Sequence, residues 1–163
     1  DTDYMGSCVV RNKEMSSLSD VECCTFRSRY ISYVYQFFNL ISFLTVKENM
    51  CLTSQIKGKK VDEKELNQVL KLLGLEQKKD SFANELSGGQ QQRVAIGRAI
   101  LAHADIILAD EPTGNLDGEN AENVMDILKV LNGKGKTIVL VTHDLKIANY
   151  ADRIIRLEQG KIV

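Results

Sequence analysis

The sequence predicts an α/β fold in which helices cover a parallel sheet and a mostly helical lobe forms a separate part. Two observations support this prediction. From residue 105 onward, strand-like apolar runs alternate with helix-like segments, which is the order typical of parallel sheets with crossover helices. Residues 48–86, in contrast, are mostly helical in pattern. We therefore expect one domain over residues 1–163, with a lobe at about 48–86 and the remainder in the α/β core.

Strands are expected where short apolar or β-branched runs stand between polar segments. The candidates are residues 6–10, 31–35, 106–109, 137–142 and 153–157. The run 106–109 is wholly apolar, which predicts a strand buried on both faces. After the last candidate, Gln159-Gly160 predicts a tight turn, with residues 161–163 as a possible hairpin partner.

Helices are expected where apolar residues recur at helical spacing. The candidates are a short helix entered near residues 16–20, then residues 61–73, 88–101 and a segment around 121–131. In the second of these, Leu66, Val69, Leu70 and Leu73 share one face, and Gly74 predicts the helix end.

Composition excludes several functional classes. The chain is 44% hydrophobic and 26% charged, which is typical of a globular domain, and its net charge of −1 argues against a nucleic-acid partner. No apolar run reaches the roughly 18 residues of a membrane span. The four cysteines lack zinc-type spacing, so we expect reduced thiols.

Two acids end the apolar run at residues 106–109. In an open α/β fold, Asp110 and Glu111 would lie at the carboxyl edge of the sheet, where ligands bind. An aspartate there can hold Mg²⁺ on a nucleotide, and a following glutamate can take a proton from water. Taken alone, the pattern is equally compatible with ordinary surface acids.

A second candidate is the start of the helix at residues 88–101. Ser87 is a good N-cap, and Gly88-Gly89 leaves backbone N–H groups uncovered, as anion-binding helix ends require. Without other context, an ordinary capped helix is the commoner explanation. The same holds for His143 and Gln36, which follow predicted strands and could meet a phosphate, a water or a metal.

These segments occur in the motif order of an ABC-type ATPase cassette, and nearly the whole chain resembles that family. Tyr35-Gln36 resembles its Q-loop, and Leu86-Ser87-Gly88-Gly89-Gln90 is similar to its signature without a mismatch. Ile106 to Glu111 resembles Walker B with the catalytic glutamate, Asn115-Leu116-Asp117 the D-loop, and His143 the switch histidine.

The resemblance implies a P-loop NTPase-like core, ATP and Mg²⁺ as ligands, and a homodimer that holds two nucleotides head to tail. The implied catalytic residues are Glu111, His143 and Gln36, the implied metal ligands are Asp110 and Gln36, and the implied nucleotide and dimer contacts are Ser87, Gly88, Gly89, Gln90 and Asp117. Glu111 would polarise the attacking water, and the Ser87–Gln90 segment would face the γ-phosphate held by the other copy.

A branch of the family is also indicated. Residues 36–40, 44–49 and 111–117 resemble the macrolide-export and lipoprotein-release branch. The implied partner is a membrane permease, and the implied location is the cytoplasm, on the inner face of the cell membrane. Two other classes remain open: a non-catalytic remnant that binds a permease or a full-length partner, and a DNA-repair or chromosome-maintenance cassette. The second is disfavoured because no coiled-coil heptads interrupt the chain.

One expected motif is missing from these 163 residues. No G-x-x-x-x-G-K-[ST] sequence occurs, although the family carries this Walker A loop before the Q-loop. We therefore expect a truncated cassette that lacks the first strands and the P-loop helix and is inactive alone. We also expect such a chain to expose apolar surface around Ile107, Val139 and Val141.

Overall fold

A three-stranded parallel sheet forms the centre of the computed structural model, which describes residues 6–163. Its strands are β3 (Ile31–Tyr35), β4 (Ile106–Asp110) and β5 (Thr137–Val141), in the order β3-β4-β5. The register places Tyr35, Asp110 and Val141 side by side at the carboxyl ends. The predicted α/β class with a parallel sheet is confirmed.

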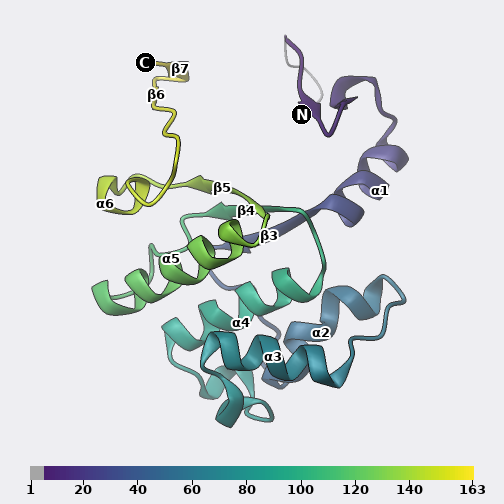
Figure 1. The fold of residues 1–163 in the computed structure, drawn as a ribbon, viewed down its shortest axis with the longest axis vertical. Coiled ribbons are helices and arrows are strands. Elements are labelled where there is room, and N and C mark those ends of the chain that lie inside the picture. Colours follow the sequence, from purple (N-terminus) through teal and green to yellow (C-terminus); the bar gives the residue numbers. More distant parts are fainter. Residues whose placement is uncertain (1–5) are drawn as a thin grey trace.

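Helices cover one face of this sheet. Helix α4 (Gly88–Leu101) packs against β3, and α5 (Gly118–Gly133) packs against β5 and α4. Figure 1 shows both helices on the same side of the sheet, with α2 and α3 farther from it. Val34, Ile107 and Ala109 point into this interface and are 0–1% exposed.

The opposite face carries apolar side chains that remain open to solvent. Tyr33 and Tyr35 stack on each other with ring centroids 5.7 Å apart, and beyond β4 lie Val139 and Val141, which are 46% and 56% exposed. Ile106 and Leu108, which alternate with the buried residues of β4, are only partly buried, so the expectation that β4 is buried on both faces is wrong. The expectation that Ile107 is exposed is also wrong. Successive side chains of a strand point to opposite faces, so only alternate residues of β4 reach the helices.

The region between β3 and α4 is helical, as expected. It contains α2 (Val46–Ile56), α3 (Glu63–Leu73) and two short 3₁₀ turns, Glu76–Lys78 and Ala83–Glu85. Helix α3 begins two residues later than predicted because Asp62 is its N-cap, and Gly74 ends it with a left-handed φ of 62°.

Close packing joins this region to the sheet-bound helix α4. A β-carbon placed on Gly97 of α4 would lie 2.5 Å from Met50 Cε and 2.8 Å from Leu73 Cδ1, so a larger residue at this position would require the ends of these two side chains to shift. Residues of all three helices and of β3 and β4 therefore belong to a single hydrophobic core.

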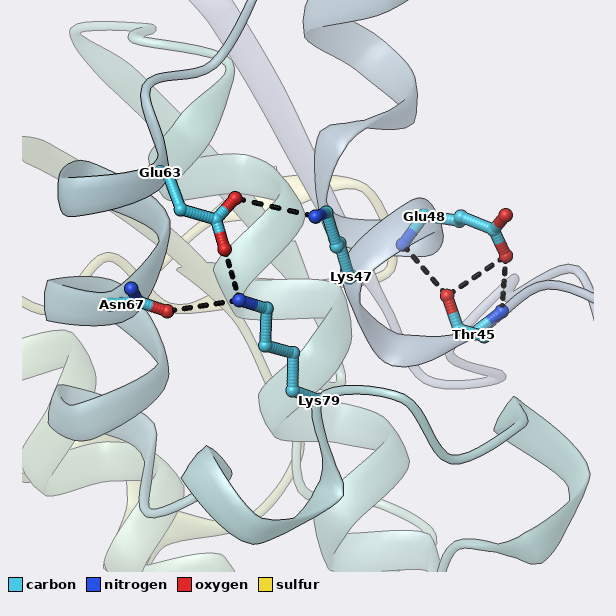
Figure 2. Close-up of polar contacts among 6 residues, drawn as sticks. All are labelled: Thr45, Lys47, Glu48, Glu63, Asn67 and Lys79. Carbon is cyan, nitrogen blue, oxygen red and sulfur yellow. Dashed lines mark hydrogen bonds and ion pairs between the residues drawn. The ribbon is translucent and has the colours of Figure 1, made fainter.

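Polar contacts fix the outer side of the same region (Figure 2). Thr45 and Glu48 form a capping box at the start of α2. Glu63 of α3 pairs with Lys47 of α2 at 3.3 Å and with Lys79, which also donates to Asn67 Oδ1 at 3.2 Å. Exposed pairs of this kind contribute about 0–1 kcal/mol each, so the packed core supplies most of the stability.

The N-terminal part differs from expectation. The predicted strand at residues 6–10 is a two-residue strand, β1 (Val9–Val10), which pairs with β2 (Lys13–Glu14) in a hairpin. A 3₁₀ turn (Met15–Ser17) follows, then α1 (Asp20–Tyr30), which confirms the helix expected near residues 16–20. Residues 1–5 lie outside the described part of the chain.

The C-terminal part contains a short helix, α6 (Leu145–Ala148), and a hairpin of β6 (Leu157–Glu158) and β7 (Lys161–Ile162). The turn falls at Gln159 and Gly160, both with positive φ, as the sequence predicts. The strand expected from residue 153 is wrong over residues 153–156, which have no ladder partner among the described residues. Within residues 6–163, no helix has the length and apolar character that crossing a bilayer requires.

Candidate functional site

Three predicted site residues lie within two positions of the ends of the parallel strands. Gln36 comes after β3, Glu111 after β4, and His143 two positions after β5. The backbone N–H of Glu111 donates to Val141 O at 2.9 Å, which draws the chain after β4 toward the chain after β5. Carboxyl ends of parallel strands meet at one edge of a sheet, so the register of β3, β4 and β5 accounts for this grouping.

Glu111 makes the most specific contacts in this group. Its Oε1 accepts from the backbone N–H of His143 at 2.9 Å and lies 2.8 Å from His143 Nδ1, while Thr142 Oγ1 donates to its Oε2 at 3.2 Å. The Glu111 backbone is left-handed, with φ 44°. Non-glycine residues adopt this conformation rarely and at a cost of about 1–3 kcal/mol, so the surrounding contacts hold it in place.

The two side chains differ in their access to solvent. The side chain of Glu111 is 20% exposed and that of His143 is 87% exposed. The hydrogen bond and the negative charge of Glu111 raise the pKa of His143 above its ordinary value. The imidazole is therefore charged over a wider pH range than a free histidine, with the carboxylate held beside it.

Replacement of Glu111 by glutamine is expected to lower the pKa of His143 toward its ordinary value, because the neighbouring negative charge is lost. The pair favours the folded state below the ordinary pKa of histidine, and this contribution disappears as pH rises through the raised pKa of His143. An NMR titration of the imidazole signals would measure the change. His143→Ala identifies which signal belongs to this ring, and an unchanged titration in Glu111→Gln would contradict the pairing.

The arrangement also suits a hard cation. Asp110 ends β4 with an exposed carboxylate, and Gln36 Nε2 donates to Asn115 Oδ1 at 3.4 Å, which leaves the Gln36 amide oxygen available. Mg²⁺ prefers oxygen ligands and is usually held by one or two carboxylates together with substrate phosphates. The residues therefore fit a shared Mg²⁺–phosphate site, although residues 6–163 contain no cluster of three acidic, histidine or cysteine side chains.

The start of α4 forms a separate group. Ser87 and Gln90 make a reciprocal capping box, with Gln90 Oε1 3.0 Å from Ser87 N. A β-carbon on Gly89 would lie 2.2 Å from Asn120 Oδ1, so the glycine permits contact with the first turn of α5. Within residues 6–163, no side-chain hydrogen bond joins Ser87–Gln90 to Asp110, Glu111 or His143.

Asp117 has a local role in this structure. It is the N-cap of α5, where it accepts from Asn120 N at 2.9 Å. This backbone hydrogen bond, together with one from the Asn120 side chain, lowers the pKa of Asp117. The interpretation of Asp117 as a residue that communicates across a dimer stays a prediction.

Two residues near the site were not identified from the sequence. Thr142 contacts Glu111, and Gln92 of α4 is fully buried with its amide donating to backbone carbonyls of Tyr35 and Pro112. A signal for Gln92 was present: residues 92, 95, 96 and 99 share the buried face of α4 at helical spacing, and only the first is polar.

Comparison with known proteins supplies an independent line of information. A family model described as ABC transporter matches residues 2–114. The chain is 44% identical over its whole length to the macrolide export ATP-binding/permease protein MacB of Mannheimia succiniciproducens, and it spans 26% of that relative. It is 42% identical to an uncharacterized ABC transporter ATP-binding protein, MJ1508 of Methanocaldococcus jannaschii, of which it spans 74%.

Solved structures give a matching result. The structure superimposes on a dimeric ABC transporter cassette, MJ0796, with a TM-score of 0.81 and 42% identity, covering 94% of this chain and 69% of that one. A second structure of MJ0796, a dimeric post-hydrolysis state bound to ADP and Pi, gives a TM-score of 0.79 at 41% identity, again covering 94% of this chain and 69% of that one.

Proposed function

The chain belongs to the ABC transporter family, and we propose that it is the ATP-hydrolysing part of a transporter that drives export through a membrane permease. The observation that carries this proposal is the contact between Glu111 and His143 at the carboxyl edge of the parallel sheet. A base held against an imidazole, beside exposed Asp110, suits hydrolysis of a bound phosphoanhydride.

In the proposed reaction, Glu111 orients water and accepts its proton, while His143 stabilises the γ-phosphate. The raised pKa of His143 supports this role, because a protonated imidazole attracts phosphate charge. Asp110 and Gln36 would hold Mg²⁺, which supplies charge neutralisation on the phosphates when bound. The remaining contribution of the protein is to position the reacting groups, which accounts for much of the catalysis in phosphoryl transfer.

Two copies are proposed to share each nucleotide. The Ser87–Gln90 segment begins the 14-residue helix α4, so its N-terminus carries partial positive charge. The similarity to a dimeric ABC transporter cassette supports a second copy as the partner of this segment. Asp117, which caps α5 beside this segment through Asn120, would lie at the same dimer interface.

Residues 48–86 are proposed to be the lobe that meets the permease. Phe37, which follows Gln36, and Phe43, which precedes α2, are 74% and 76% exposed, whereas Phe38 and Leu40 are partly buried. Both exposed phenylalanines lie outside residues 48–86, and we propose that they extend the contact surface beside the lobe. The complex would lie at the inner face of the cell membrane. The relative MacB is a fused ATP-binding/permease protein, which supports a permease as the partner.

The test uses a fusion protein, called the Walker A fusion below, in which a Walker A strand, loop and helix precede residue 1. We expect Mg²⁺-dependent ATP hydrolysis, measured as phosphate release, and none when the lysine of the added loop is replaced by alanine. ATP binding without hydrolysis would favour the alternative, a non-catalytic remnant that only binds a permease or full-length partner.

A further inference from the structure

Gln92 is a fully buried amide on the face of α4 that packs against the sheet. Its Nε2 donates to Pro112 O at 2.6 Å and to Tyr35 O at 3.3 Å. Its Oε1 is buried and has no hydrogen-bond partner among the described residues. Burying an unpaired amide oxygen costs free energy. The two hydrogen bonds that Nε2 donates are the polar contacts that oppose this cost.

The orientation of the amide follows from its surroundings. Both neighbours of Nε2 are carbonyl oxygens, which only accept hydrogen bonds, so a flipped amide would place oxygen against oxygen. The Gln92 side chain therefore supplies both of its N–H donors to backbone atoms that lie 57 and 20 residues away in sequence.

The two acceptors stand directly beside proposed site residues. Tyr35 precedes Gln36, and Pro112 follows Glu111. We propose that Gln92 is a positioning residue that fixes the Gln36 loop and the Glu111 loop relative to each other. This inference rests on the proposed function, because it assigns Gln92 a role in aligning the proposed Mg²⁺ ligand with the proposed base.

The position of Gln92 in α4 also connects these two loops to the Ser87–Gln90 segment. It lies within the first turns of α4, the helix whose N-terminus is the Ser87–Gln90 segment. A change in the direction of α4 would therefore displace the Tyr35 and Pro112 carbonyls together. Neither carbonyl can move independently without losing its hydrogen bond to Gln92, which is the physical basis for coupling them.

Amide hydrogen exchange on the 163-residue chain is the first measurement. Gln92→Met keeps a similar volume but removes both donors. We expect protection to fall at least about tenfold in residues 36–40 and 111–116, with β4 amides as the internal reference. The matched control is Gln91→Met, because Gln91 also donates to a backbone carbonyl, that of Leu86, within its own segment. It should leave both loops unchanged.

Turnover in the Walker A fusion is the second measurement. Small misplacement of reacting groups costs up to about a hundredfold in rate, so we expect Gln92→Met to lower kcat by about tenfold to a hundredfold with little change in KM for ATP. If the fusion hydrolyses no ATP even with Gln92 present, the proposed function fails, and hydrogen exchange alone then decides whether Gln92 couples the loops.

Some results would overturn the proposal. A uniform loss of protection across the chain would assign Gln92 to general stability, as would failure of Gln92→Met to fold. Loss of protection in only one of the two loops would contradict the coupling. Equal falls in kcat for Gln92→Met and Gln91→Met would show that the effect is not specific to Gln92, which would contradict its positioning role.

Discussion

Replacement of Glu111 by glutamine is expected to lower ATP turnover in the Walker A fusion by at least about a hundredfold. A positioned base contributes about 10²–10⁴-fold, equivalent to roughly 3–5 kcal/mol in the barrier. Glutamine keeps the shape of the side chain and an oxygen that can accept from the His143 N–H, but it cannot take a proton from water. ATP binding and ATP-dependent dimerisation should therefore persist.

The measurement is steady-state phosphate release, with light scattering to follow the dimer. Glu122→Gln serves as the matched control, because this glutamate lies exposed on α5 and should leave turnover unchanged. Near-normal turnover of Glu111→Gln would mean that another group accepts the proton. Loss of ATP binding in this variant would instead indicate that Glu111 organises the site rather than acting as base.

Replacement of Ser87 by arginine is expected to abolish the ATP-bound dimer of the Walker A fusion while leaving ATP binding to the monomer nearly intact. The long side chain would occupy the space proposed for the γ-phosphate of the other copy, and it would replace the oxygen that caps α4. A cap contributes about 1 kcal/mol, so some loss of stability is also expected.

Ser87→Ala separates these two effects, because it removes the cap but introduces no bulk. We expect this control to lose about 1 kcal/mol in urea unfolding and still to form the dimer with ATP. Size-exclusion chromatography with light scattering, in the Glu111→Gln background, would compare the two variants. If monomeric Ser87→Arg and monomeric Ser87→Ala lost nucleotide binding equally, the segment would act in the site of its own chain. That result would contradict the shared site.

Local sequence signals determined most of the elements. Helix α4 runs from Gly88 to Leu101, as predicted, because the Ser87 cap and the apolar spacing are encoded within a few neighbouring residues. The strand at residues 31–35 and the turn at Gln159-Gly160 were found for the same reason. The motif order also predicted membership of the ABC transporter family, which the comparisons confirm.

Tertiary structure determines which face of each element is buried and which other elements it contacts. The apolar run of β4 suggested burial on both faces, yet only Ile107 and Ala109 are buried, while Ile106 and Leu108 are partly buried. Among the described residues, helices cover only one side of the sheet, and Val139 and Val141 on β5 are exposed on the other. The sequence of a strand does not specify how many layers of structure pack on its sheet, since an apolar strand is compatible with one covering layer or with two.

The same limit applies to the candidate site. Sequence identified Gln36, Asp110, Glu111 and His143 as separate residues, but the contact between Glu111 and His143 depends on the register of β4 and β5. Gln92 reaches two carbonyls far away in sequence only after α4 has docked on the sheet. Contacts between distant residues follow from packing, whereas caps and turns follow from the nearest neighbours in the chain.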